Sequence, residues 1–310
     1  MRRYNHVAVL MGGWSAEREV SLWSGAGCAE ALEKAGYQVT RVDATRDLAE
    51  QLRALKPDVC FNALHGRWGE DGSIQGVLEY LRIPYSHSGV LASALAMHKE
   101  RAKTVMRAAG IPVPDGRVVS RHEAAKSHVL PPPYVLKPVA EGSSVGVFIV
   151  KADQSHPPQE LTASDWKFGD ELLAEKYIAG RELTCAVIAD EPTSIIDIVP
   201  AEGLQFYDYD SKYVEGGSRH ILPAQLSPII NQSVQRFTLL AHRALGCRGV
   251  SRADFRLDER ADGSFELACL EVNTQPGMTG TSLVPELARH KGWSLGELVR
   301  WMVEDASCDR

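Results

Sequence analysis

The first third of the chain alternates between short apolar segments and longer amphipathic ones, and this alternation limits the possible folds more than any other feature. Apolar strands are predicted at residues 6–11, 37–42 and 59–64. Helices are predicted between them, over residues 16–35 and 48–55. Parallel strands need a long crossover connection, usually a helix, and this order supplies one each time. We therefore expect a doubly wound parallel sheet.

The first predicted helix has residues at both ends that favour helix boundaries. Ser15 precedes it and is predicted as the N-cap, because a serine oxygen can accept a hydrogen bond from the first helical turn. Gly36 follows it and suits the C′ position, where the backbone usually adopts a positive φ.

The remaining two thirds of the chain follow a different pattern. Strands on both sides of a Gly/Ser loop, and another near residue 172, indicate a small α+β unit. Longer strands around one long helix then indicate an antiparallel sheet, followed by two helices. We expect a fold of mixed α/β and α+β type with three domains, at residues 1–97, 98–179 and 180–310.

Composition and charge exclude several classes of function. Of the 310 residues 44% are apolar, and the formal net charge is −6, whereas nucleic-acid-binding domains usually carry a basic excess. No apolar run approaches the roughly 20 residues that cross a bilayer. The six cysteines form no CxxC pair, which predicts a reducing, cytoplasmic setting without a zinc site. We expect neither a nucleic-acid nor a membrane partner.

Two predicted strands near the C-terminus carry polar residues within otherwise apolar sequence. Arg252 and Asp254 alternate along one strand, and Glu271 and Asn273 along the other, so each pair shares one face. If the strands pair, two carboxylates and an amide oxygen converge, which is a donor set that suits Mg²⁺. From the pattern alone, ordinary alternation on a solvated face stays equally open.

Glycine-rich loops follow several predicted strands. Residues 141–146 (EGSSVG) are small enough for backbone N–H groups to approach a phosphate, although a flexible hairpin is the alternative. Lys99 and Lys137 could meet a phosphate as point charges or lie in solvent. Residues 65–72 (HGRWGEDG) come at the carboxyl end of a predicted parallel strand, which is where ligands bind in such sheets.

Two further segments suit a substrate site. Glu17 lies in the first strand–helix turn, where its charge could complement the helix macrodipole or bind the amine of a small substrate. Residues 206–213 (FYDYDSKY) have no helix or strand period, and their composition suits either a lid that excludes water or a surface loop.

Taken together and in this order, the motifs resemble those of the D-alanine–D-alanine ligases of the ATP-grasp superfamily. The resemblance covers nearly the whole chain. It rests on residues 12–21 (GGWSAEREVS), 65–72, 141–146, 206–213, 252–254 and 271–279 (EVNTQPGMT). It implies a three-domain ATP-grasp architecture in which ATP lies between the central and C-terminal domains.

The resemblance also implies an ATP site and a metal site. Two lysines match the family's phosphate-binding residues, and the other positions match its loop, adenine and ribose contacts. The implied ATP-binding residues are Lys99, Lys137, Ser143, Ser144, Glu175, Lys176, Ile178, Glu182 and Phe206. Asp254, Glu271 and Asn273 match the ligands of two Mg²⁺ or Mn²⁺ ions.

The family's reaction implies roles for the remaining residues. ATP phosphorylates one D-alanine, and the amine of a second D-alanine displaces phosphate to give D-alanyl-D-alanine for peptidoglycan precursors. The positions that match the D-alanine sites are Glu17, His65, Lys212, Arg252, Ser282 and Leu283. Those with an implied catalytic role are Glu17, Ser143, Tyr213, Arg252, Gly277 and Ser282. The family also implies a homodimer.

Two positions deserve separate expectations. Tyr213 points to an amine nucleophile, because this lid position differs in related ligases that make D-alanyl-D-lactate. His98 stands where the family usually has an acidic residue, so we expect the helix that begins there to be less well capped.

Three other functions stay open at this stage. Another ATP-grasp ligase would share the ATP residues and differ around Glu17, His65, Tyr213 and Ser282. A catalytically silent nucleotide-binding protein is disfavoured by the intact polar residues on the two C-terminal strands. A dinucleotide-binding oxidoreductase is disfavoured because the first glycine turn lacks a GxGxxG pattern.

Overall fold

The structure, a computed structural model, describes residues 2–142, 146–200 and 217–308. Five residues with expected roles lie outside this described part: Ser143, Ser144, Phe206, Lys212 and Tyr213. Within it, no helix is both long and apolar enough to cross a membrane. All six cysteines are described, and none forms a disulfide.

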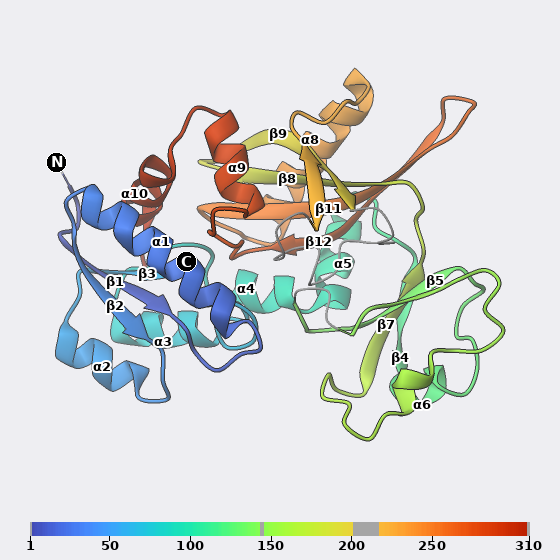
Figure 1. Ribbon diagram of the computed structural model, residues 1–310, viewed down its shortest axis with the longest axis horizontal. Helices are drawn as coiled ribbons and strands as arrows, with labels where there is room; N and C mark the ends of the chain where they lie inside the picture. The colour runs from blue at the N-terminus through green and yellow to red at the C-terminus, as the bar shows by residue number, and fades with distance from the viewer. Residues whose placement is uncertain (1, 143–145, 201–216, 309–310) are drawn as a thin grey trace.

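The N-terminal unit is a parallel three-stranded sheet with the order β2-β1-β3 (Figure 1). The strands are β1 (His6–Met11), β2 (Gln38–Asp43) and β3 (Val59–Asn62). Successive side chains of β1 enter different cores, because a strand points alternate residues to opposite faces. Val7 and Val9 pack on the side of α1 (Arg18–Lys34), whereas Ala8 and Leu10 pack on the other side.

Helices cover both faces of this sheet, so the predicted doubly wound arrangement is confirmed. The far core includes Leu48 and Leu52 from α2 (Leu48–Leu55) and Leu78 from α3 (Ser73–Leu81). These leucines recur at helical spacing, which places them on one face of each helix.

The central unit is a four-stranded antiparallel sheet with the order β4-β7-β5-β6 and its own apolar core. Its elements are β4 (Gly116–Ser120), α6 (Arg121–Ala124), β5 (Tyr134–Pro138), β6 (Phe148–Val150), a 3₁₀ turn (Gln159–Thr162) and β7 (Glu171–Lys176). The core residues, among them Tyr134 and Leu136, all come from this segment of the chain. In Figure 1 the unit stands apart at the lower right.

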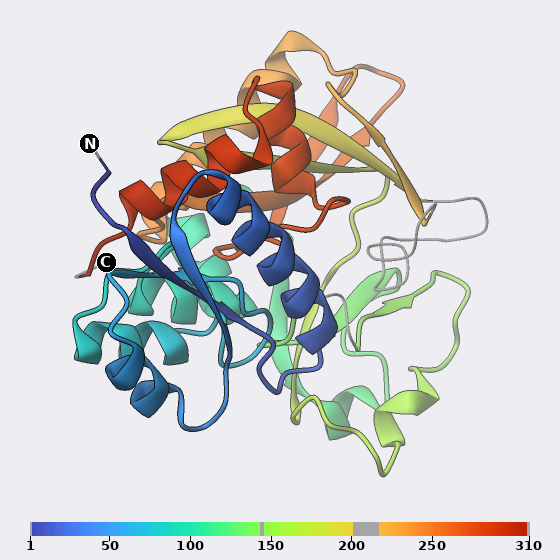
Figure 2. The ribbon, with the colours of Figure 1, turned by 60° about the vertical axis from the view of Figure 1, so that its left-hand side comes forward.

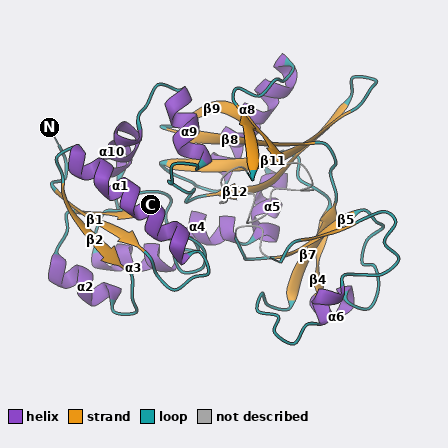
Figure 3. Cartoon of the chain, viewed as in Figure 1, coloured by secondary structure: helices purple, strands orange, loops and turns teal. Residues whose placement is uncertain are grey.

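The third sheet is antiparallel, as predicted, with the order β10-β9-β8-β11-β12. Figure 3 shows its long strands beside the C-terminal helices. The elements are β8 (Arg181–Ile188), β9 (Glu191–Pro200), β10 (Ser218–Ile221), α8 (Pro228–Ala244), β11 (Val250–Glu259), β12 (Phe265–Asn273), α9 (Leu283–His290) and α10 (Leu295–Asp305).

Two helices connect the N-terminal unit to the central one. The sequence pattern missed α4 (Val90–Met97), because its mixture of small and apolar residues has no polar face. It is followed by α5 (Lys99–Ala108). Ala102 and Met106 of α5 pack into the core of the third sheet, beside Phe255. The division into three domains at the expected boundaries stays a prediction.

The N-terminal sheet and the C-terminal helices share one core. Val7 and Phe61 of the parallel sheet lie in the same cluster as Leu298 and Met302 of α10. The Tyr4 hydroxyl donates to the carbonyl oxygen of Ala306 at 2.8 Å. Figure 2 shows α10 lying alongside α1, with both ends of the chain on the same side of the molecule.

One expected helix cap, Ser15, is wrong. The N-cap of α1 is Glu17, and Ser15 lies outside the helix, where its Oγ accepts from the Glu17 N–H at 3.1 Å. His98 does cap α5, because its Nδ1 accepts from the Arg101 N–H at 3.4 Å. An imidazole nitrogen thus caps this helix through one long hydrogen bond, and the expectation that the start is less well capped than with an acidic residue stays a prediction.

Candidate functional site

Two adjacent pockets lie where the three sheets meet. The first pocket is lined by the N-terminal unit, the end of β12 and the start of α9, and includes Glu17, His65, Arg252, Asn273 and Ser282. The second pocket lies between the central and third sheets and includes Val135, Lys137, Ile178, Glu182 and Asp254. Lys99, Glu141 and Glu271 line both pockets. The two pockets therefore adjoin at these three side chains.

Strands β11 and β12 bring together the polar residues that alternation predicted. The antiparallel register sets Arg252 opposite Asn273 and Asp254 opposite Glu271. Arg252 binds Asp254 through two hydrogen bonds, from Nε to Oδ1 at 2.9 Å and from Nη2 to Oδ2 at 2.8 Å. Thr184 of β8 also donates to Asp254 Oδ1, at 2.6 Å. Sequence reasoning missed Thr184, because only the fold shows that its strand, β8, pairs with β11.

Two carboxylates and an amide are a suitable donor set for Mg²⁺, which prefers oxygen ligands and usually shares them with phosphate oxygens and water. Asp254, Glu271 and Asn273 come from adjacent strands in register. The described residues contain no group of three or more His, Cys, Asp or Glu side chains that is placed to hold a metal ion. The donor set of these three residues fits a divalent cation that phosphate oxygens and water also bind.

Two buried lysines share one carboxylate behind the second pocket. Lys103 Nζ contacts Glu175 Oε2, and Lys137 Nζ contacts Glu175 Oε1. Burial, together with the charge of Lys137, lowers the pKa of Lys103 to about 8. Burial also opposes the charge of Lys137, but Glu175 and Glu271 outweigh it and raise the pKa of that lysine. Burial likewise opposes the charge of Glu175, and the two lysines outweigh it and lower the pKa of Glu175.

Sequence reasoning missed Lys103, although a signal was present. Lys103 lies one helical turn after Lys99, so both lysines occupy the same face of α5, and that face is buried. A buried lysine requires a partner of opposite charge, so the acidic residues of neighbouring strands are the candidates.

The other residues of the second pocket form its apolar and polar walls. Val135 and Ile149 supply apolar surface from the central sheet. Glu182 accepts from Arg256 Nη1 at 3.4 Å, at the base of β8 and β11. Lys176 lies at the rim, where its ammonium binds Glu266 Oε1 at 2.7 Å. Lys176 and Glu182 both line this pocket, as does the intervening Ile178.

Lys99 stands between the two pockets at the start of α5. Its Nζ donates to the carbonyl oxygen of Glu141 at 2.5 Å and lies 3.5 Å from Glu271 Oε2. Its backbone N–H donates to the carbonyl oxygen of Val139 at 2.8 Å. These bonds fix a cation next to the candidate metal ligands and at the beginning of the 141–146 loop.

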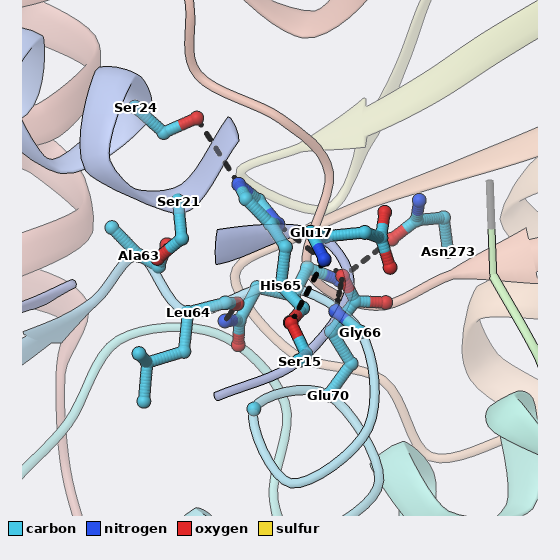
Figure 4. Close-up of polar contacts among 12 residues, drawn as sticks. Ser15, Glu17, Ser21, Ser24, Ala63, Leu64, His65, Gly66, Glu70 and Asn273 are labelled. Atoms are coloured by element: carbon cyan, nitrogen blue, oxygen red, sulfur yellow. Dashed lines mark hydrogen bonds and ion pairs between the residues drawn. The ribbon is translucent and has the colours of Figure 1, made fainter. Parts of the chain in front are cut away.

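Glu17 and His65 line the first pocket from two loops of the N-terminal unit (Figure 4). Glu17 is buried, and its carboxylate lies against glycines on two sides. A Cβ at Gly142 would lie 3.0 Å from Glu17 Oε2, and one at Gly66 would lie 2.5 Å from the same oxygen. Gly66 also has a φ of +71°, a conformation that residues with a Cβ rarely adopt.

The N-terminus of α9 forms the opposite wall of the first pocket. Ser282 is the N-cap, and its Oγ accepts from the Thr279 N–H at 2.9 Å. Ser282 and Leu283 both line the pocket, so the positive end of the helix dipole faces it. Backbone N–H groups at such an end bind anions, including carboxylates. Gly277 lies beside Ser282, and a Cβ there would be 2.9 Å from Ser282 Oγ.

A buried amide network joins the N-terminal sheet to the loop after β12, and sequence reasoning missed it. Asn62 Nδ2 donates to Gln275 Oε1 at 2.7 Å and to the Gly69 carbonyl oxygen at 3.1 Å. Gln275 Nε2 donates in turn to the carbonyl oxygen of Leu64. The network fixes the loop that carries Gly277 against the N-terminal unit.

The comparisons with known proteins agree with this architecture. A family model described as the D-ala D-ala ligase C-terminus matches residues 105–304, and one described as the D-ala D-ala ligase N-terminus matches residues 44–88. A D-alanine–D-alanine ligase of Parvibaculum lavamentivorans is 66% identical over 310 residues, with 100% of both chains covered. Another, of Azorhizobium caulinodans, is 68% identical over 305 residues, covering 98% of this chain and 99% of the relative.

Solved structures agree as well. A D-alanine–D-alanine ligase from Bacillus anthracis superposes with a TM-score of 0.79 at 33% identity, covering 97% of both chains. A structure of that enzyme complexed with ATP gives a TM-score of 0.77 at 31% identity, covering 98% of this chain and 97% of the other. The fold is thus the three-part ATP-grasp architecture of an ATP-dependent ligase. Within that class, the chain belongs to the D-alanine–D-alanine ligase family.

Proposed function

We propose that this chain joins two molecules of D-alanine through a D-alanyl phosphate intermediate and releases ADP and phosphate. The observation that carries the proposal is the pair of pockets that share Lys99, Glu141 and Glu271. One pocket is lined by lysines and apolar side chains, and the other by a buried carboxylate and a helix N-terminus. This pairing suits a phosphoryl donor beside two small zwitterions.

ATP is expected in the second pocket. Lys99 and Lys137 would bind its phosphates, with Ser143 and Ser144 in the loop that covers them. Adenine would lie near Glu175, Lys176, Ile178 and Phe206, and the ribose near Glu182. Glu175 forms ion pairs with two buried lysines, so its side chain would also hold Lys137 in position to bind the phosphates.

Asp254, Glu271 and Asn273 would hold two Mg²⁺ or Mn²⁺ ions. Such ions would neutralise the negative charge that develops on the transferred phosphoryl group. Arg252 binds Asp254 through two hydrogen bonds; Arg252 lines the first pocket and Asp254 lines the second. Arg252 and the Gly277 N–H would stabilise the oxyanion formed when the amine attacks.

The first pocket would bind both D-alanines. Glu17 would accept the ammonium of the first, with His65 beside it. Ser282, Leu283 and Lys212 would accept the carboxylate of the second, since the α9 N-terminus favours an anion. Tyr213 and Ser143 would join Glu17 in closing the lid, which protects the acyl phosphate from hydrolysis.

The main test is D-alanine-dependent phosphate release from MgATP, with the dipeptide measured in the same reaction. Equal amounts of phosphate and D-alanyl-D-alanine are expected. A product that contains a different amine would retain the ligase class and change the substrate. Nucleotide binding without turnover would support the silent nucleotide-binding alternative.

A substitution on β11 tests the metal site. Asp254→Asn should lower dipeptide formation at least about 100-fold, because one metal-binding charge is lost. Asp258→Asn is the matched control: this carboxylate lies on the same strand, four residue pairs further along, beside Arg260. Equal activities of the two variants would contradict the metal assignment.

Three wider aspects belong to the same proposal: a role in peptidoglycan precursor synthesis, a cytoplasmic location and a homodimer. Exposed apolar side chains on neighbouring helices support the last of these, namely Tyr80 of α3 with Val90 and Leu91 of α4. Light scattering at micromolar concentration would test the dimer. Tyr80→Glu should shift the mass toward that of one chain.

A further inference from the structure

The His65 ring is held through both of its nitrogens in the wall of the first pocket. Its Nδ1 lies 3.2 Å from Glu70 Oε1, and its Nε2 lies 3.1 Å from Ser24 Oγ. Ser24 comes from α1 and is fully buried, and His65 is 5% exposed. Figure 4 shows the Ser24 hydroxyl directed at the ring.

The partners of this chain set the direction of its hydrogen bonds. Glu70 Oε1 also accepts from the Gly66 N–H at 3.0 Å, and an ionised carboxylate can only accept, so the Nδ1–H of His65 donates to it. Ser24 Oγ accepts from the Met278 N–H at 3.2 Å. The Ser24 O–H is then available to donate to Nε2 of a neutral ring. In this arrangement every donor meets an acceptor.

The hydrogen bonds end at two backbone N–H groups that lie next to groups of the proposed reaction. The Met278 N–H belongs to the peptide that follows Gly277, so Ser24 fixes the orientation of that peptide. At the other side, Ser15 Oγ donates to the His65 carbonyl oxygen at 2.7 Å and accepts from the Glu17 N–H at 3.1 Å. The position of His65 therefore sets that of the Glu17 backbone.

We propose that Ser24 is a positioning residue of the first D-alanine site. It holds His65 as the neutral Nδ1–H tautomer and, through that ring and Met278, sets Glu17 and Gly277 at their places. His65 then contributes by its position, since both ring nitrogens are bound to the protein. The identity of the ligand rests on the proposed function, whereas the arrangement of protons does not.

Ser21 supplies a matched control on the same helix. It lies three residues before Ser24, is equally buried, and its Oγ donates to the carbonyl oxygen of Ala63 at 2.8 Å. Ser21→Ala and Ser24→Ala thus each remove one buried hydroxyl from α1. In the described structure, the Ser24 hydroxyl alone of these two contacts His65.

Kinetics separate a positioning role from a structural one. Ser24→Ala should raise KM for D-alanine about 5- to 20-fold, the effect of losing one buried hydrogen bond. KM for ATP should stay within about twofold in Ser24→Ala, since the hydrogen bonds that link Ser24, His65 and Met278 do not reach the second pocket. Ser21→Ala should leave both constants within about twofold. Equal effects of the two variants on KM for D-alanine would overturn the proposal.

The tautomer is tested without any substrate, by ¹⁵N-labelling of histidine and NMR of the full chain at neutral pH, with His65→Gln to assign the signals. The wild type should show His65 with a protonated Nδ1 and an unprotonated Nε2. Ser21→Ala should keep this pattern, and Ser24→Ala should shift the Nε2 signal. A protonated Nε2 in the wild type would overturn the proposal even if Ser24→Ala fails to fold. Failure of dipeptide synthesis in the wild type, with the expected tautomer present, would instead count against the proposed function alone.

Discussion

At the scale of single residues, the cluster of Lys103, Glu175 and Lys137 determines how firmly the second pocket is built. Two ammonium groups share one carboxylate, and all three side chains are buried. If one lysine is removed, the other still pairs with Glu175. If the Glu175 carboxylate is removed, both buried lysines lose the negative charge that they share. The loss of the partner of a buried charge is among the most costly single changes.

We therefore expect Glu175→Gln to destabilise the protein by about 3–5 kcal/mol and Lys103→Met by roughly 1–2 kcal/mol. Urea unfolding of both variants measures the difference. Lys176→Met is the control, because the exposed pair of Lys176 with Glu266 should be worth less than about 1 kcal/mol. A larger loss for Lys103→Met than for Glu175→Gln would show that packing, and not charge balance, dominates.

A second buried group makes stability depend on pH. Burial lowers the pKa of His242 from its ordinary 6.5 to about 4, and its Nδ1 lies 2.7 Å from Ser251 Oγ. Between pH 4 and 6.5 the unfolded chain therefore binds a proton at His242 that the folded chain does not bind. This contribution to stability is complete above pH 6.5 and is lost as the pH falls toward 4, at up to about 1.4 kcal/mol per pH unit.

Urea unfolding at several values between pH 4 and 7 measures this slope. His242→Gln should unfold with a flatter dependence over the same range, because glutamine does not titrate. An unchanged slope in the variant would assign the acid sensitivity to other groups.

At the scale of elements, each helix end stabilises the fold according to the number and geometry of its capping hydrogen bonds. Ser294 and Glu297 form a complete capping box at the start of α10, whereas Ser227 caps α8 by a single bond of 3.4 Å. We expect Ser294→Ala to cost about 1 kcal/mol and Ser227→Ala less than half of that. Thermal unfolding of the two variants compares them. The reverse order would mean that tertiary packing determines both helix starts.

At the scale of the whole molecule, the apolar cores do not follow the order of the sequence, since one core contains segments from both ends of the chain. One core joins β1 and β3 to α9 and α10, so the first and last parts of the chain are stabilised together. The core of the central sheet contains residues from that sheet's own segment alone, within the described part of the chain. Separate cores can open separately.

Native-state hydrogen exchange should therefore show lower opening free energies in β5 and β7 than in β1 and β8. Magnesium and ATP should raise protection in β5 and β7, because the second pocket has residues from both the central and third sheets. Amide-resolved exchange with and without MgATP measures both effects. Equal protection of all four strands without ligand would show a single cooperative unit.

The sequence predicted the elements of the fold better than the contacts between them. The parallel strands, most helices and the facing pairs on β11 and β12 followed from hydrophobic period, because period depends on neighbours along the chain. Helix α4 was missed because small residues on all sides give no period. The cap at Ser15 was wrong because α1 begins at Arg18, two residues later than its pattern predicted.

By itself, the sequence determined the order of most elements, the motifs and the family to which they belong, all of which depend on residues close together in the chain. Only the tertiary structure decided which distant residues meet: Lys103 with Glu175, Asn62 with Gln275, and Ser24 with Met278. Each of these pairs is buried, so each polar group needs a partner, but many distant residues could have supplied one. Packing of the sheets against one another selects that partner, and periodicity carries no information about it.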